Sequence, residues 1–257
     1  MSIPYRIALV TGASAGIGEA FCRQLAPRCE KIIAVARRAG RLEALAAELA
    51  GETEVVPLAA DLTTVEGVTR VLEALRQQGP VDTLVNNAGF STFGPFAESD
   101  IDRELALLRL HLDASLELSH AALPFMREAG GGRIINLGSV GALINMPSTA
   151  VYGAAKAFLL QFSQSLQAEV AEDGIAVQCL CPGLTHTEIH GQPDMAGFDK
   201  SRLPETLWMQ PAEVVAASLA ALEQPGAPVV VVPGAVNREM LGGAVETLAA
   251  SIQQQVF

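Results

Sequence analysis

The stretch ALVTGASAGIGEA, residues 8–20, passes from a short apolar run through closely spaced glycines into an amphipathic pattern. Gly12, Gly16 and Gly18 follow the spacing G-x-x-x-G-x-G. Glycine is needed where a backbone turns tightly or approaches a bound pyrophosphate, and the N-terminus of the following helix attracts phosphate. A glycine turn without a ligand is the alternative. Its position between the first strand and the first helix favours a dinucleotide-binding α/β unit.

Short apolar runs alternate with longer amphipathic stretches along the rest of the chain. Runs typical of buried parallel strands occupy 6–10, 31–36, 54–60, 81–86, 133–138, 175–181 and 228–232. Helical patterns occupy 17–28, 38–50, 64–78, 100–129, 150–173 and 211–224, with Ser99 and Gln210 as expected caps. The alternation predicts one α/β domain over 1–257. We expect a Rossmann-like, doubly wound parallel sheet of about seven strands with helices on both faces.

Composition and charge disfavour several classes of protein. The chain has 257 residues, of which 50% are apolar, and a formal net charge of −11. This acidic balance argues against nucleic-acid binding, which needs clustered Lys and Arg. No uninterrupted apolar run is long enough to indicate an integral membrane segment. The first strand is expected close to Met1, which leaves no room for a signal peptide and predicts a cytoplasmic protein.

The four cysteines do not form a pattern typical of a metal site. Cys179 and Cys181 lie two positions apart in a predicted buried strand, and we expect their side chains on opposite faces. That placement would disfavour a disulfide, and no matching His/Cys cluster occurs elsewhere. We therefore expect no bound metal, and reduced thiols at these two positions and at Cys22 and Cys29.

The end of the second predicted strand indicates which dinucleotide would bind. Asp or Glu at this place suits a ribose 2′-hydroxyl, whereas Arg suits a 2′-phosphate. The sequence has Ala36 followed by Arg37 and Arg38, with no carboxylate. A guanidinium can hold phosphate through paired, charge-assisted hydrogen bonds. We therefore expect NADP(H) rather than NAD(H), with Arg37 the first candidate; Arg38 could equally be a solvated residue of the next helix.

The stretch VYGAAK, residues 151–156, places Tyr152 and Lys156 four positions apart in a helical pattern. Residues at this spacing share a helix face, so the phenol and the ammonium can approach one another. A neighbouring ammonium favours the phenolate and brings the phenol closer to useful proton transfer. A solvated pair on a surface helix is the alternative.

Five motifs together resemble the short-chain dehydrogenase/reductase family over roughly residues 5–235. They are TGASAGIG (11–18), NNAG (86–89), Ser139, YGAAK (152–156) and PGLTHT (182–187), in this order. The tail VVVVPGAVNREML (229–241) is similar to a bacterial subgroup described as broad short-chain dehydrogenases.

The resemblance implies a cofactor site. Its residues would be Gly12, Ser14, Gly16, Ile17, Gly18, Arg37, Arg38, Asp61, Leu62, Asn87, Ala88, Gly89, Tyr152, Lys156, Pro182, Gly183, Thr185 and Thr187. Asp61 would bond the adenine amine, and Asn87 to Gly89 would line the cleft. Thr185 or Thr187 would bond the nicotinamide carboxamide.

The resemblance also implies catalytic roles. Tyr152 would donate a proton to a carbonyl oxygen that Ser139 holds and polarises, while Lys156 would bond the nicotinamide ribose and lower the pKa of Tyr152. Family members often carry an Asn where counting back from Pro124 reaches His111. Histidine could hold a similar water of the proton relay. It could equally be a packed helix residue.

Three further features concern substrate and assembly. The irregular segment 183–210 is expected to be a substrate lid, and residues 235–257 a C-terminal extension ending in an amphipathic helix. Aromatic and methionine residues could form an apolar substrate wall: Phe90, Phe93, Phe96, Met146, Met195, Phe198 and Trp208. By resemblance, the helices at 100–129 and 150–173 would form a homodimer or homotetramer.

These features predict an NADPH-dependent reductase of a small, apolar ketone or aldehyde. The alternatives are an alcohol dehydrogenase working in the oxidative direction and a non-catalytic NADP(H)-binding sensor or scaffold. The intact Ser139, Tyr152 and Lys156 disfavour the last, because a pure binding protein needs no proton donor.

Overall fold

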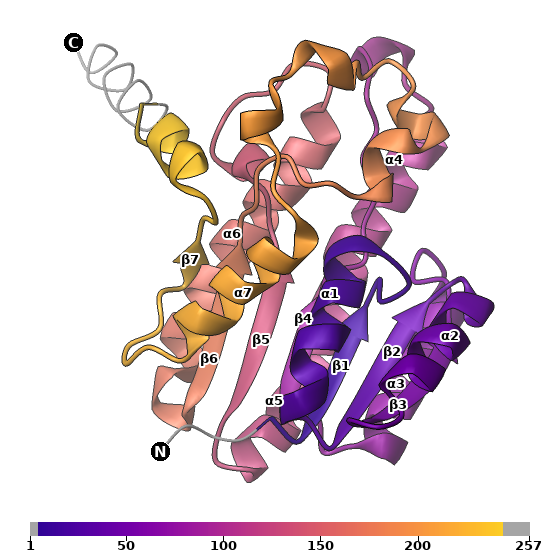
Figure 1. Cartoon of the computed structure of the whole chain (residues 1–257), viewed down its shortest axis with the longest axis vertical. Coiled ribbons are helices and arrows are strands. Elements are labelled where there is room, and N and C mark those ends of the chain that lie inside the picture. Colours follow the sequence, from indigo (N-terminus) through magenta and orange to yellow (C-terminus); the bar gives the residue numbers. More distant parts are fainter. Residues whose placement is uncertain (1–4, 244–257) are drawn as a thin grey trace.

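A parallel sheet of seven strands, in the order β3-β2-β1-β4-β5-β6-β7, forms the centre of the computed structural model, which describes residues 5–243 (Figure 1). The strands are β1 (Ile7–Thr11), β2 (Lys31–Ala36), β3 (Glu54–Ala59), β4 (Thr83–Asn86), β5 (Gly132–Leu137), β6 (Ile175–Leu180) and β7 (Val230–Val231). The chain leaves β1 toward β2 and returns to β4 on the other side, so the strand order reverses there. The predicted doubly wound fold is confirmed.

Two apolar cores lie on opposite faces of the sheet. Helices α1 (Gly16–Leu25), α2 (Ala39–Leu49) and α7 (Pro211–Leu222) pack into one core, around Phe21, Leu42 and Leu219. Helices α3 (Val65–Gln78), α5 (Ala114–Glu128) and α6 (Ala150–Val170) pack into the other. Burial on both faces explains why the strands read as continuous apolar runs.

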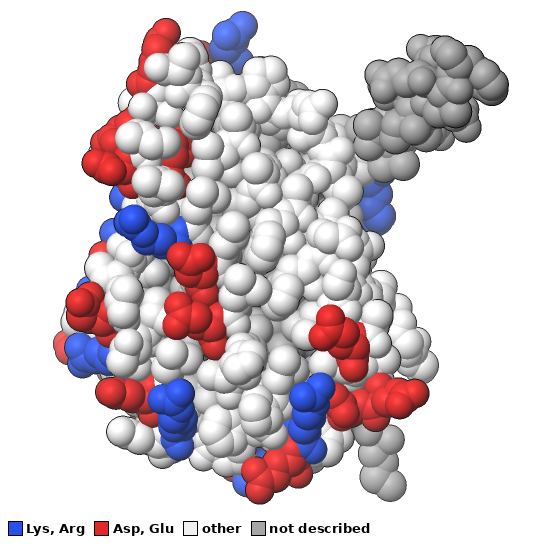
Figure 2. All heavy atoms as spheres, turned by 180° about the vertical axis from the view of Figure 1, so that it is seen from behind, with Lys and Arg blue, Asp and Glu red and all other residues white. Residues whose placement is uncertain are grey.

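The face seen from behind in Figure 2 carries its charged side chains mainly toward the left and lower margins, and its middle is largely uncharged. The helices on the distant side of Figure 1 include α4 (Ile101–Leu108), α5 and α6. Large apolar side chains are exposed on α4 at Ile101 and Leu105 and on α5 at Leu116. An apolar helix surface of this kind suits contact with another protein surface.

The long helical pattern at 100–129 is interrupted in the structure. A π-helical turn over Arg109–Asp113 separates α4 from α5, and His111 lies within this turn. Such turns insert an extra residue into a helix and are frequent at functional sites. Asp100, rather than the predicted Ser99, caps α4, because its carboxylate accepts hydrogen bonds from the N–H groups of Asp102 and Arg103. The predicted Gln210 cap of α7 is confirmed.

Cys179 in β6 and Cys181 just after it lie on the same side of the strand, so the expectation of opposite faces was wrong. The Sγ atoms of Cys179 and Cys181 are 3.6 Å apart, and both residues are fully buried. Side chains alternate along a strand with a period of two, so positions i and i+2 share a face. Both are free thiols, as are Cys22 and Cys29.

The segment between β6 and α7 consists of short 3₁₀ turns above the carboxyl ends of the strands (orange in Figure 1). These turns are η6 (Glu188–Gly191), η7 (Pro193–Met195), η8 (Lys200–Arg202) and η9 (Glu205–Leu207). After β7, residues 235–243 are helical; the remainder of the expected C-terminal helix lies outside the described residues. Within 5–243, no helix has the length and apolar character needed to cross a membrane.

A chain of buried hydrogen bonds joins the centre of the sheet to α5 and α6. The Asn86 amide on β4 donates to Asn136 Oδ1 on β5 (2.9 Å) and to Ser119 Oγ on α5 (3.1 Å). The Asn136 amide donates to Ser163 Oγ on α6 (2.9 Å). Buried polar groups are stable only when they are paired, so this chain fixes α6 against β5.

We expect Asn136→Ala to lower the free energy of unfolding by about 1–3 kcal/mol, because Asn86 and Ser163 each lose one buried hydrogen-bond partner. Urea denaturation measures this loss. Gln161→Ala, on the exposed side of α6, is the matched control and should change stability by less than about 0.5 kcal/mol. Equal stability of the two variants would contradict the role given to Asn136.

Candidate active site

A cleft of about 740 Å³ follows the carboxyl ends of the central strands. It brings together all but one of the site residues expected from the sequence: Gly12, Ser14, Gly16, Ile17, Arg37, Arg38, Asp61, Leu62, Asn87, Ala88, Gly89, His111, Ser139, Tyr152, Lys156, Pro182, Gly183, Thr185 and Thr187. The exception, Gly18, lies beneath the lining. A Cβ there would be 2.3 Å from the carbonyl oxygen of Gly12, so its role is close packing of α1 on β1.

The glycine turn is locked onto the end of β4. The Thr11 hydroxyl accepts hydrogen bonds from the N–H groups of Asn87 and Ala88, both at 2.9 Å. The Asn87 amide donates to the Thr11 carbonyl at 2.7 Å. Gly12 has a φ of +69°, and a Cβ on it would lie 2.6 Å from Asn87 Nδ2. Only glycine fits at position 12, because any side chain would clash there. The exposed backbone can therefore approach a ligand beside the N-terminus of α1.

The two arginines after β2 differ in their contacts. Arg38 donates through Nε (3.1 Å) and Nη2 (3.0 Å) to Ser14 Oγ, and through Nη1 to Glu188 of the segment above the cleft (2.7 Å). Arg38 is thus not a simply solvated residue. Arg37 lines the cleft and makes no hydrogen bond or ion pair within residues 5–243. Its guanidinium is therefore available to an anionic ligand.

Asp61 and Leu62 follow β3 on the same side of the cleft. Burial opposes ionisation of Asp61, but hydrogen bonds from the Thr63 N–H (3.0 Å) and hydroxyl (2.8 Å) outweigh it and lower the pKa of the carboxyl. Asp61 is therefore ionised at neutral pH and can accept a hydrogen bond from an amine, as its expected role toward adenine requires.

Ser139 and Tyr152 form the reacting end of the cleft. Ser139 follows β5, and its hydroxyl oxygen accepts a hydrogen bond from the N–H of Gly141 at 3.0 Å, which leaves its proton to donate elsewhere. Burial raises the pKa of Tyr152 above 10, and a hydrogen bond with the Ser139 hydroxyl partly offsets this effect. Tyr152 is therefore protonated at neutral pH.

Lys156 is buried beneath Tyr152, on the next turn of α6. Its ammonium donates to the carbonyl oxygen of Leu137 at 2.6 Å and lies 5.4 Å from the centre of the Tyr152 ring. Burial lowers the pKa of Lys156 to about 8, and Cys179 and Cys181 oppose this shift. Desolvation is the largest effect on the pKa of Tyr152, and the expected lowering of that pKa by Lys156 stays a prediction.

His111 reaches the cleft from the π-helical turn. Its Nε2 lies 3.0 Å from the carbonyl oxygen of Phe90 and 3.3 Å from the Phe90 nitrogen, and its ring packs edge-on against that of Tyr152. Nδ1 is buried without a hydrogen-bond partner among the described residues. Burial, helped by the charge of Lys156, holds the pKa of His111 well below 6.5. His111 is therefore a neutral ring at neutral pH.

The apolar wall is partly as expected. Phe90, Phe93, Met146, Met195 and Phe198 line the cleft. Two expectations were wrong: Phe96 is 58% exposed and lies outside the cleft, and Trp208 lines a second cavity. The sequence interpretation missed further apolar wall residues, among them Leu110, Ile144, Leu203, Leu207 and Met240. Met240 lies in the tail stretch 229–241, whereas the other four belong to no recognised motif and occur in ordinary apolar patterns.

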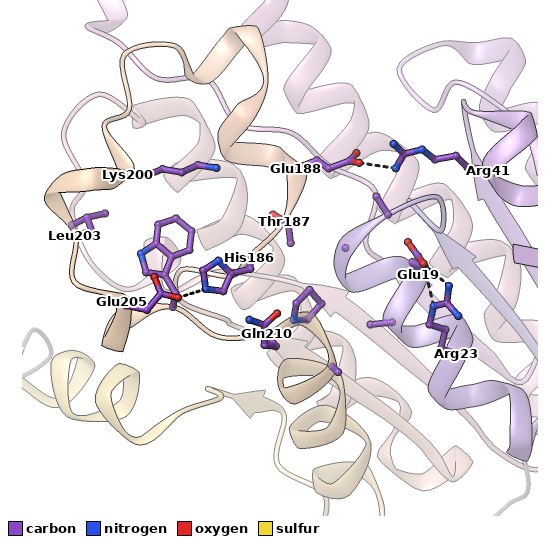
Figure 3. Close-up of a pocket in the computed structure, with 16 residues that line it drawn as sticks. Glu19, Arg23, Arg41, His186, Thr187, Glu188, Lys200, Leu203, Glu205 and Gln210 are labelled. Atoms are coloured by element: carbon purple, nitrogen blue, oxygen red, sulfur yellow. Dashed lines mark hydrogen bonds and ion pairs between the residues drawn. The ribbon is translucent and has the colours of Figure 1, made fainter. Parts of the chain in front are cut away.

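The second cavity, of about 650 Å³, lies between α1, the start of α7 and the segment after β6 (Figure 3). Its polar side chains are largely paired: Arg41 with Glu188 at 2.6 Å and the His186 ring with Glu205 at 2.8 Å. Trp208 stacks on His186, with ring centres 5.1 Å apart. None of the expected catalytic residues lies here.

The family profile described as short chain dehydrogenase matches residues 6–195. The chain belongs to the short-chain dehydrogenase/reductase family. An uncharacterized oxidoreductase of Staphylococcus epidermidis is 33% identical over 183 residues, covering 71% of this chain and 79% of that protein. The protein is therefore an oxidoreductase.

Two solved structures resemble this short-chain dehydrogenase over nearly its whole length. One is a short-chain dehydrogenase from Sphingobium yanoikuyae in complex with NADPH, with a TM-score of 0.82 and 36% identity, covering 96% of this chain and 95% of that one. The other is the bulky-bulky ketone specific alcohol dehydrogenase from Comamonas testosteroni, with a TM-score of 0.77, 30% identity and coverage of 100% and 98%.

The buried Lys156 of this short-chain dehydrogenase gives a stability prediction. The native lysine loses its proton near pH 8 and the unfolded one near 10.5, so the unfolded state binds more protons between these values and stability rises with pH. We expect the unfolding free energy of the wild type, relative to Lys156→Met, to rise by about 2–3 kcal/mol across this window. Urea denaturation at several pH values measures it. A constant difference would contradict the lowered pKa.

Proposed function

We propose that the protein is an NADP(H)-dependent carbonyl reductase whose substrate is a ketone or aldehyde with bulky apolar groups, larger than the small apolar substrate expected from the sequence. The observation that carries this proposal is one continuous cleft. It holds Ser139, Tyr152 and Lys156 at one end and the glycine turn with the free guanidinium of Arg37 at the other.

The residues present fit a dinucleotide with a 2′-phosphate. The glycine turn offers backbone that a Cβ at Gly12 would block, next to the N-terminus of α1. Arg37 and Arg38 provide positive charge after β2, where no carboxylate stands. Structures described as complexes with NADPH or NADP+ among the similar proteins support the same choice.

The site chemistry follows from the protonation states of three residues. Bound NADPH would supply the hydride. Tyr152, protonated at neutral pH, would donate its proton to the substrate oxygen, while the Ser139 hydroxyl would donate a hydrogen bond to the same atom. Lys156 would bond the nicotinamide ribose. A protonated phenol is the form that carbonyl reduction requires.

The walls of the cleft indicate the substrate. Phe90, Phe93, Met146, Met195 and Phe198 surround the space near Ser139 and Tyr152, from loops and from the proposed lid 183–210. Apolar walls with few polar groups suit a bulky apolar ketone. The similarity to a bulky-bulky ketone specific alcohol dehydrogenase supports this substrate class.

His111 is proposed as a neutral positioning residue. Its contacts with Phe90 and Tyr152 hold the wall of the cleft in place, and its free Nδ1 could serve the proton relay. The largely uncharged middle of the face in Figure 2, together with the exposed side chains of Ile101, Leu105 and Leu116, supports assembly as a homodimer or homotetramer. A cytoplasmic location stays a prediction from the sequence.

The proposed proton donor can be tested with a matched pair, because the chain has only two tyrosines. We expect Tyr152→Phe to bind NADPH as the wild type does but to lower kcat by about 10²–10⁴-fold, since it removes one positioned proton transfer. NADPH oxidation with a panel of apolar ketones and aldehydes measures turnover. Tyr5→Phe, which removes a buried hydroxyl that has no hydrogen-bond partner among residues 5–243, should keep full activity. Full activity in Tyr152→Phe would refute the mechanism.

The proposed cofactor preference has its own test. We expect Arg37→Ala to raise the Kd for NADPH by about 10–100-fold, the value of a charge-assisted hydrogen bond, and to leave the Kd for NADH unchanged. Fluorescence titration of both cofactors measures this. Arg70→Ala, at an exposed position on α3, is the control. An equal loss for NADH and NADPH would mean that Arg37 does not bind the 2′-phosphate.

A further inference from the structure

The carboxylate of Glu188 is bound by two guanidiniums, one from Arg38 just before α2 and one from Arg41 in its first turn. Arg38 Nη1 donates to Glu188 Oε2 at 2.7 Å, and Arg41 Nη1 donates to Oε1 at 2.6 Å. These hydrogen bonds lower the pKa of Glu188, so the group is ionised at neutral pH. Figure 3 shows Glu188 reaching from its segment across to Arg41.

Arg38 has little hydrogen-bonding capacity left for a second anion. Its Nε and Nη2 both face Ser14 Oγ, and its Nη1 faces Glu188. Ser14 belongs to the glycine turn, so Arg38 lies on the floor of the cofactor cleft. A phosphate approaching this guanidinium on its open side meets the Glu188 carboxylate, which also lines the cleft.

We propose that Glu188 is a cofactor-specificity residue, because its carboxylate competes with the 2′-phosphate of NADP(H) for Arg38, which lines the cleft, while Arg41 holds the same carboxylate from the second cavity. This inference rests on the proposed use of NADP(H). A phosphate dianion offers more charge and more acceptor oxygens than a carboxylate, so it can displace Glu188. Until it does, Glu188 reduces the affinity for NADPH and has no effect on NADH, which lacks that phosphate.

The same exchange links cofactor binding to the proposed lid. Glu188 directly follows Thr187, whose Cγ2 lies 3.0 Å from the place that a Cβ on Gly16 would occupy. The carbonyl of Glu188 also accepts a hydrogen bond from Gln192 at 3.3 Å. Displacing the carboxylate therefore removes the ion pairs that hold this edge of the segment to α2 while the other edge stays bound through Asp194 and Arg103.

The test compares Glu188→Gln with Glu205→Gln. Glu205 belongs to the same segment but pairs with His186, not with an arginine, so it is a matched control. The Kd values for NADPH, NADH and adenosine 2′,5′-bisphosphate are measured by fluorescence or calorimetry at low and high salt. Thermal unfolding checks that both variants are folded.

We expect Glu188→Gln to bind NADPH and adenosine 2′,5′-bisphosphate about three- to tenfold more tightly than the wild type, the effect of losing two partly exposed ion pairs. Its affinity for NADH should not change, and added salt should reduce the gain. Glu205→Gln should bind all three ligands as the wild type does.

Unchanged or weaker NADPH binding by Glu188→Gln, or an equal gain for NADH, would overturn the role given to Glu188. The wild-type protein tests the underlying proposal separately. If it binds NADH more tightly than NADPH and Glu188→Gln keeps that order, the proposed cofactor preference is wrong as well.

Discussion

The whole site depends on the contact between the end of β1 and the end of β4. The chain leaves these neighbouring strands in opposite directions, which opens a crevice at the carboxyl edge of the sheet. Thr11 closes the bottom of this crevice with three hydrogen bonds, two from Asn87 and one from the N–H of Ala88. The bonds draw the two loops so close that Gly12 and Gly18 have no room for a Cβ. The same packing that excludes side chains exposes backbone N–H groups to a ligand.

The reacting end needs a second constraint, because Ser139 and Tyr152 come from different elements. The buried amides of Asn86 and Asn136 connect β4 and β5 to α6, which carries Tyr152 and Lys156. This hydrogen bonding fixes how α6 lies against the end of β5. It also places Lys156 where its ammonium meets the Leu137 carbonyl in a buried environment. The low pKa of Lys156 is therefore a consequence of where the helix is held.

Much of this could be predicted from the sequence, because the deciding signals are local. Continuous apolar runs located all seven strands, and β2 has the predicted bounds. Glycine spacing and the Tyr152/Lys156 register located both ends of the cleft. These patterns depend on backbone geometry and side-chain period, which nearby residues determine.

The missed features depend on tertiary contacts. The π-helical turn at His111 has no sequence signature in the pattern 100–129, which reads as one helix. Glu188 follows a recognised motif, but only the folded chain shows that it faces Arg38 and Arg41. The cysteine pair is a different case, because the period of a strand already places Cys179 and Cys181 on one face.

The segment above the cleft is held in a way that suits reversible movement. Its short 3₁₀ turns supply few backbone hydrogen bonds of their own. Carboxylates hold its edges: Glu188 pairs with Arg38 and Arg41, and Asp194 pairs with Arg103, which also stacks on Phe90 of the cleft wall. Exposed and half-exposed ion pairs each contribute little to stability. Segments held in this way open at low free energy compared with the sheet. The proposed lid would therefore open and close above a sheet edge that keeps the reacting groups aligned.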